Sequence, residues 1–265
     1  MYETTYRRAG SVAEAAQFIA KAEDGKLLAG GQTLIPTMKQ RLAAPSDLVD
    51  IGGIADLKGI SESGGAVRIG AGTRHSDVAG SDVVKRLFPG LAKLAGGIGD
   101  PHVRHMGTIG GSVANNDPAA DYPSALVALR ATVITNKREI AADDFFTGMF
   151  ETALEDNEII IAVSFPVPEK SSYAKYPNPA SRYAMTGVFV ARHKDGSVRV
   201  AVTGAGQGGV FRVEAMERAL AAHWDPSAVE GIPVDPNDLL SDIHGSAVYR
   251  ANLITVMAKR AVAAA

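Results

Sequence analysis

Cysteine is missing from all 265 residues of the chain. Its absence excludes disulfide bonds and thiolate nucleophiles, and it also removes the ligands that iron–sulfur clusters require. If this protein handles electrons, it must therefore do so through an organic cofactor.

An excess of one charge is lacking too, because 27 basic residues stand against 29 acidic ones and the formal net charge is −2. Such a chain has no general basic field for a polyphosphate backbone, so we expect no nucleic-acid partner and only local phosphate contacts. Long apolar runs are also missing. Glu3, Arg7, Arg8 and Glu14 interrupt the first twenty residues where a secretory signal would be apolar, which predicts a cytoplasmic protein without a membrane span.

The order of the expected elements is that of an α+β fold. Ser11 and Glu14 fit a capping box that opens a helix, and a strand, a glycine turn, a helix and a strand follow over residues 26–51. Further along, the patterns predict a hairpin at 54–72, a helical region at 76–95, strands at 131–135, 139–141, 159–165, 185–193 and 198–203, and helices at 213–223 and 246–264. Residues 96–122 carry glycines and prolines without periodicity, which is typical of a long functional loop. The polar, Pro-containing stretch 166–179 is the candidate domain boundary.

The first glycine segment runs from Leu28 to Leu34 with the sequence LAGGQTL. It places two glycines and a hydroxyl between a strand and a helix start, where unpaired backbone amides favour an anion such as a diphosphate. Glycine allows the ligand to approach the backbone closely. A tight β–α turn without a ligand explains the same pattern, and the segment alone does not decide between them.

The second glycine segment, Gly107 to Val113 with the sequence GTIGGSV, repeats the pairing of a hydroxyl with a double glycine. Two such turns can hold one ligand from two sides. Asp121 follows, and its carboxylate suits either ribose hydroxyls or the N-cap of a helix before Pro123. Both roles fit the spacing.

Three other patterns favour competing functions more weakly. Gly204 to Gly209 matches the G-x-G-x-x-G fingerprint, but too little chain follows to complete a Rossmann sheet. His75, His102 and His105 lack a compact third metal ligand, so a surface or flavin-pocket role is favoured for them over a metal site. Tyr173, Tyr176 and Tyr183 flank cations in a mixture that suits stacking on a base or a flavin, but core packing of an antiparallel sheet is the favoured explanation.

Three segments together carry a family resemblance: LAGGQTLIPTMKQRLAAPSDLVDI at 28–51, GDPHVRHMGTIGGSVANNDPAADYP at 99–123 and KYPNPASRYAMTGVFVA at 175–191. They resemble the FAD-binding medium subunit of the carbon monoxide dehydrogenase and xanthine dehydrogenase family. The resemblance spans nearly the whole chain. It implies an FAD domain of the vanillyl-alcohol oxidase (PCMH) type, over residues 1–177, followed by a small C-terminal α+β domain with an antiparallel sheet and helices, over residues 178–265.

The resemblance also implies the site residues. The positions that correspond to the family's FAD contacts are Ala29, Gly30, Gly31, Gln32, Thr33, Leu34, Thr108, Ile109, Gly110, Gly111, Ser112, Asp121, Ile160 and Lys175. The chain departs from the family at His105 and Met106, where members often have Asn and Arg. No residue is assigned as an acid, a base, a nucleophile or a metal ligand.

By the same resemblance, FAD on this chain passes electrons from iron–sulfur clusters to an external acceptor. A large molybdopterin-binding subunit and a small subunit with [2Fe-2S] clusters are the implied partners, in a heterotrimer that is often doubled. A stand-alone flavin oxidase or reductase and a non-catalytic nucleotide-binding module are the alternatives. The sequence does not specify the substrate or the acceptor.

Overall fold

A small parallel sheet forms the N-terminal part of the computed structural model, which describes all 265 residues. Its strand order is β1-β3-β2, and the chain passes through β1 (Thr5–Arg8), α1 (Val12–Lys21), β2 (Gly25–Leu28), α2 (Leu34–Lys39) and β3 (Asp47–Asp50). The predicted helix start is confirmed, because the Ser11 hydroxyl accepts a hydrogen bond from the Glu14 amide, and the Glu14 carboxylate accepts one from the amide of Gly10, the residue before the N-cap. In the register, Arg8 and Leu28 both lie beside Asp50, so all three strands end at one edge.

A five-stranded antiparallel sheet forms the middle of the molecule, in the order β4-β5-β10-β6-β7. Its strands are β4 (Ile60–Ser63), β5 (Ala66–Gly70), β6 (Thr132–Thr135), β7 (Glu139–Ala141) and β10 (Ile160–Pro166). The predicted hairpin turn is confirmed at Gly64 and Gly65, whose positive φ angles suit a tight turn. The predicted helical region at 76–95 is three short helices: α3 (His75–Gly80), α4 (Asp82–Leu87) and α5 (Pro89–Gly96).

The prediction of a long loop at 96–122 is wrong. The stretch contains α6 (Pro101–Met106), α7 (Ile109–Asn115) and the start of α8 (Tyr122–Ala128). Helices of six or seven residues show too little of a 3.6-residue repeat to be read from periodicity. The glycines of α7 also suggested a loop. Gly110 instead lies within a helix, where its close approach to Ala71 leaves no room for a Cβ.

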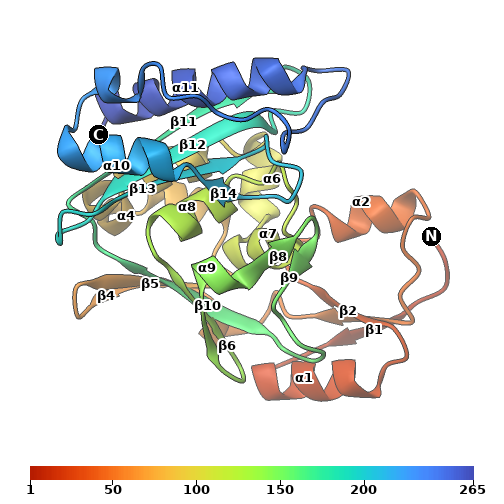
Figure 1. Cartoon of the computed structure of the whole chain (residues 1–265). Coiled ribbons are helices and arrows are strands. Elements are labelled where there is room, and N and C mark those ends of the chain that lie inside the picture. Colours follow the sequence, from red (N-terminus) through yellow and green to blue (C-terminus); the bar gives the residue numbers. More distant parts are fainter.

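The C-terminal part is an antiparallel sheet in the order β11-β12-β13-β14, covered by helices (Figure 1). It consists of β11 (Lys170–Pro177), β12 (Ala184–Arg192), β13 (Val198–Thr203), β14 (Phe211–Arg212), α10 (Glu214–Ala222) and α11 (Ala247–Ala263). Side chains of β12 alternate between two cores: Val188 and Val190 pack with the residues of α10 and α11, whereas Phe189 and Ala191 pack with those of α8. Two small strands, β8 (Phe146–Gly148) and β9 (Glu151–Thr152), follow the short helix α9 (Ala142–Phe145).

The last sheet also bears on the predicted boundary and on the Rossmann alternative. β11 pairs with β12 from Lys170 onward, so a division after residue 177 separates this strand from its sheet. The fingerprint glycines at 204–209 follow β13, which pairs antiparallel with β14, so the parallel β-α-β unit of a dinucleotide fold is not formed there.

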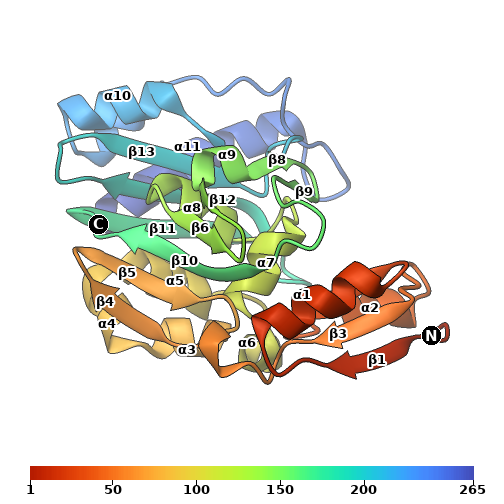
Figure 2. The same ribbon diagram turned by 90° about the horizontal axis from the view of Figure 1, so that it is seen from below.

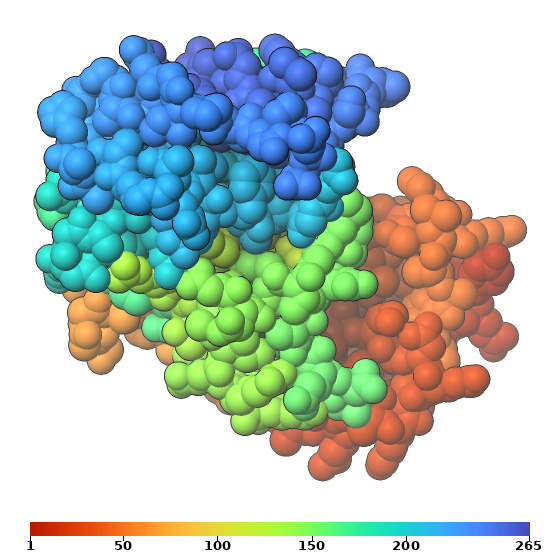
Figure 3. Space-filling model, in the orientation of Figure 1, coloured from red at the N-terminus to blue at the C-terminus, as the bar shows by residue number.

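The N-terminal part stands apart from the rest as a lobe (Figure 2), and a hollow lies between this lobe and the segments drawn in green (Figure 3). The large cavity described below is lined from both sides of this hollow. No helix in the structure has the length and apolar character needed to cross a membrane.

Candidate functional site

A cavity of about 980 Å³ separates the N-terminal lobe from the middle of the molecule. Its walls come from β2 and the turn before α2, from α7, from the loop before β10 and from the turn between β11 and β12. This volume lies at the upper end of the range for small-molecule and cofactor sites.

The cavity brings together most of the residues that the sequence predicted to contact FAD. Those that line it are Ala29, Gly30, Gly31, Gln32, Thr33, Leu34, Thr108, Gly110, Gly111, Ser112, Asp121 and Ile160. Ile109 and Lys175 do not line it. The Ile109 side chain is fully buried in the core, and the Lys175 ammonium group donates hydrogen bonds to the carbonyl of Gly97 and to Asp121.

The first glycine turn presents free backbone donors. The amides of residues 29–34 make no hydrogen bond with any other group of the chain. Gly31 has a φ of +68°, a left-handed conformation that bends the chain between β2 and α2. Unpartnered amides in sequence, at the start of a helix, favour an anion.

The second glycine turn is built differently. The amides of Ile109 and Gly110 donate to the carbonyls of Thr73 and Ala71, at 3.1 and 2.8 Å, and the Gly111 amide donates to the Thr108 hydroxyl. These donors are already satisfied, so the turn mainly offers the free Thr108 amide and the hydroxyl of Ser112. The expectation that both turns bind through main-chain amides therefore fits the first turn better than the second.

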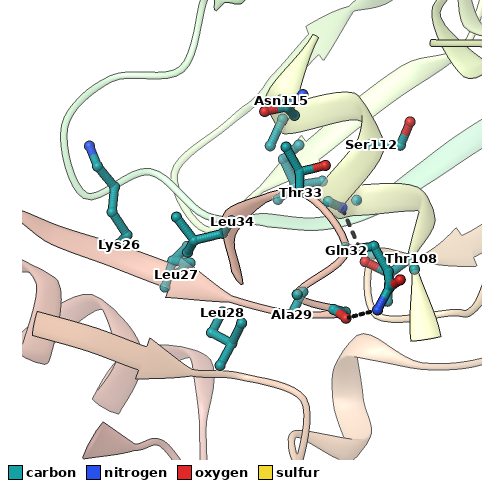
Figure 4. A pocket seen from close by; sticks show the side chains of 18 of the residues that line it. Lys26, Leu27, Leu28, Ala29, Gln32, Thr33, Leu34, Thr108, Ser112 and Asn115 are labelled. Atoms are coloured by element: carbon teal, nitrogen blue, oxygen red, sulfur yellow. Dashed lines mark hydrogen bonds between the residues drawn. The ribbon is translucent and has the colours of Figure 1, made fainter. Parts of the chain in front are cut away.

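The two turns do meet. A Cβ added to Gly30 would lie 2.2 Å from the carbonyl oxygen of Met106 and 2.7 Å from Cα of Gly107, so only glycine permits this approach. Figure 4 shows Gln32 and Thr33 facing Thr108, Ser112 and Asn115 of α7. One ligand can therefore contact both turns at once.

Asp121 is 4% exposed and takes part in a buried ion pair. Its carboxylate accepts hydrogen bonds from the Tyr173 hydroxyl at 2.5 Å and from the Lys175 ammonium at 3.1 Å. Burial raises the pKa of Asp121, although Lys175 and Tyr173 oppose this effect. The side chain makes no helix-capping bond to α8. Because a carboxylate offers about four lone-pair sites, it retains capacity for a ligand hydroxyl.

Glu158, in the loop two residues before β10, anchors the far wall of the cavity. Its carboxylate accepts hydrogen bonds from Thr135 and Arg138 and from the Glu155 amide. Burial alone would raise the pKa of Glu158, but these hydrogen bonds outweigh it and lower the pKa to about 2. The carboxylate thus remains charged and fixes the loop that ends at Ile160.

His75, for which the sequence favoured a surface or flavin-pocket role over a metal site, lines the cavity. It is 4% exposed, its ring lies 5.4 Å from that of Tyr122, and its Nδ1 has no hydrogen-bond partner. Burial, helped by the positive charge of Arg104, lowers the pKa of His75 from 6.5 to about 4. The imidazole is therefore neutral at pH 7.

The pKa of His75 predicts a loss of stability in mild acid. Below pH 6.5 the unfolded chain binds a proton at His75 that the folded chain, with a pKa of about 4, does not bind. The free energy of unfolding should therefore fall by about 2 kcal/mol from pH 7 to pH 5 on account of this group. Urea unfolding of the wild type and of His75→Gln at both pH values measures this contribution as the difference in slope. His102→Gln, at an exposed histidine, is the control and should keep the wild-type pH dependence of stability. If His75→Gln also keeps the wild-type pH dependence, the prediction is contradicted.

The turn between β11 and β12 adds Ser181, Arg182 and Tyr183 to the cavity mouth. Among the three tyrosines for which core packing was the favoured explanation, Tyr173 is 2% exposed whereas Tyr183 is 48% exposed. Core packing therefore describes Tyr173 but not Tyr183. The alternation of polar and apolar residues in the sequence gave no signal that would have separated them.

The geometry of the site agrees with the proteins to which this chain is similar. The model of the FAD binding domain in molybdopterin dehydrogenase matches residues 2–168. The carbon monoxide dehydrogenase medium chain of Hydrogenophaga pseudoflava is 34% identical and aligns over 98% of this chain and 96% of its own length. The nicotine 6-hydroxylase medium subunit of Paenarthrobacter nicotinovorans is 34% identical over 97% of this chain and 95% of its own. In structure, quinoline 2-oxidoreductase from Pseudomonas putida 86 superposes with a TM-score of 0.86 at 28% identity, over 99% of this chain and 96% of that one.

Proposed function

Because this chain belongs to the family of FAD-binding subunits of molybdenum-containing dehydrogenases, we propose that it is the electron-transferring FAD subunit of a molybdenum hydroxylase. FAD, when bound, supplies the redox chemistry by accepting electrons from iron–sulfur clusters and passing them to an external acceptor. The chain's own residues bind, orient and shield the cofactor.

One observation carries the proposal: two glycine turns, about eighty residues apart in sequence, meet at one cavity, and the first presents a row of free amides. A diphosphate needs such donors. The amides of residues 29–34, the Thr108 amide and the hydroxyls of Thr33 and Ser112 are the groups that fit it best. Ile160 offers an apolar contact at the far wall.

Asp121 and Lys175 act together in this proposal. Lys175 holds the Asp121 carboxylate at the cavity wall, where it is placed to accept a hydrogen bond from a ribose hydroxyl. Lys175 is then a positioning residue and does not contact the cofactor directly. Lys175, which stands at the family's basic position, would act through its ion pair with Asp121.

The proposed partners are a large molybdopterin-binding subunit and a small [2Fe-2S] subunit, in a dimer of heterotrimers in the cytoplasm. The chain without cysteine cannot hold the clusters itself, so electrons must reach its FAD from another polypeptide. The compared proteins are named as a carbon monoxide dehydrogenase medium chain, a nicotine 6-hydroxylase medium subunit and a quinoline 2-oxidoreductase.

Purification of the tagged chain from its native cells tests the proposal. We expect FAD, molybdopterin and iron–sulfur absorbance to co-purify with two further polypeptides. Carbon monoxide, nicotine and quinoline are the substrates to try first. The one that the complex oxidises should bleach the flavin absorbance of the complex, and it should not bleach the flavin of the chain alone. A yellow chain that travels alone and oxidises a substrate would instead support a stand-alone flavoenzyme. A colourless chain that binds no FAD when it is added would contradict both.

A further inference from the structure

A second cavity, of about 440 Å³, lies on the other side of the first glycine turn. It is at the edge where all three strands of the parallel sheet end, and Arg8 of β1, Asp50 of β3 and the turn after β2 line it. The carboxyl ends of parallel strands are the usual ligand-binding edge of an open α/β sheet. The glycine turn is thus the common wall of two cavities.

Positive charge gathers in this second cavity. Arg8, Lys58 and Arg74 line it, and none of the three makes a salt bridge or a side-chain hydrogen bond within the chain. The only acidic residue in the lining is Asp50, whose carboxylate is engaged by the Tyr6 hydroxyl and the Gly52 amide. Asp50 keeps its own charge, so three cations stand against one carboxylate and the lining carries a net positive charge that attracts an anion.

The backbone beside these cations is also suited to an anion. A Cβ at Gly53 would lie 3.0 Å from a guanidinium nitrogen of Arg8, so glycine lets this group lie against the chain. The Gly53 amide has no hydrogen-bond partner. Guanidinium groups and a free amide together match the oxygens of a phosphate.

We propose that this second cavity binds a phosphate-bearing small molecule of about the size of a nucleoside diphosphate, at a site separate from the one that holds FAD. The inference rests on the proposed FAD function only in placing FAD in the larger cavity. Because both ligands would touch opposite sides of residues 29–32, occupancy of one cavity would alter affinity in the other through the shared turn. A phosphate group in the second cavity could come from a separate ligand or from FAD that reaches across the turn. The experiment below distinguishes these two sources.

Isothermal titration of the full chain with inorganic pyrophosphate, with FAD already bound, tests the separate site. We expect binding to the FAD-loaded chain and at least tenfold weaker binding for Arg8→Gln and for Arg74→Gln, with the FAD content of both variants unchanged. Arg260→Gln, which removes an exposed, unpaired arginine on α11, is the matched control and should bind pyrophosphate as the wild type does.

Three outcomes would overturn the separate site: no binding to the FAD-loaded chain, binding that is unaffected by both cavity variants, or binding only to the FAD-free chain with displacement by FAD. The last outcome would assign the cations to the FAD site. If the chain binds no FAD at all, the proposed function fails, but the dependence of pyrophosphate binding on Arg8 and Arg74 in the FAD-free chain still decides this inference.

Discussion

Lys175→Met should destabilise the protein by about 3–5 kcal/mol, because it leaves the buried Asp121 carboxylate without its counter-ion. The two side chains are 10% and 4% exposed, so solvent cannot replace the ammonium group. The lysine also donates to the carbonyl of Gly97 and thus ties β11 to the end of α5. Tyr173 alone remains to donate to the carboxylate in the variant.

Urea unfolding measures this loss, and the double variant Asp121→Asn/Lys175→Met separates charge from packing. Removal of both charges should recover much of the stability that the single variant loses, because no uncompensated charge remains. Lys93→Met, at an exposed lysine without an ion pair on α5, is the control and should change stability by less than about 0.5 kcal/mol. Equal unfolding midpoints for Lys175→Met and the wild type would show that the pair contributes nothing.

The fold was predictable where periodicity was long and regular, and less so where short elements depend on tertiary contacts. The hairpin of β12 and β13 follows from two apolar runs around the turn at Asp195-Gly196, and the helix α11 follows from helical spacing. β1 was missed because all four of its residues are exposed, so it shows no alternation. β11 was taken for a polar linker because its side chains include Ser171 and Ser172, which are buried by packing against other parts of the chain.

The candidate site, like the fold, was predictable from the sequence only in part. The glycine turns were recognisable because a hydroxyl beside a double glycine occurs twice in the sequence, and the structure brings both turns to one cavity. The pairing of Asp121 with Lys175 was not predictable from spacing, because 54 positions separate them in sequence and only the tertiary fold brings β11 to the residue before α8. The neutral His75 was equally hidden, since its pKa depends on burial. Sequence reasoning identifies local backbone chemistry better than it identifies buried electrostatics.

Gly31→Val should lower FAD affinity by about a hundredfold or more while the protein stays folded. At a φ of +68° a β-branched residue is strained, and its Cβ would lie 3.1 Å from Cγ1 of Ile35. Relief of this strain moves the turn and misaligns the free amides of residues 29–34, each of which contributes to binding an anion. The turn lies outside the buried core, so the global fold does not depend on it.

Titration with FAD, followed by flavin fluorescence, measures this loss, and Gly196→Val is the matched control. Gly196 also has a positive φ, of +80°, but it lies in the exposed turn between β12 and β13 with open space around it. This variant should show the same backbone strain with full FAD binding. A Gly31→Val protein that binds FAD as tightly as Gly196→Val would contradict the role of the first turn.

Gly110→Val should behave differently from Gly31→Val, because its Cβ would lie 2.5 Å from Cβ and 2.8 Å from the carbonyl oxygen of Ala71. The hydrogen bond from the Gly110 amide to that carbonyl would be broken, and α7 would shift away from β5. We therefore expect a lower unfolding midpoint together with loss of FAD, whereas Gly31→Val loses FAD without a comparable change in midpoint. The first turn would then be the part of the site that binds the anion, and the second the framework that holds the first turn in place.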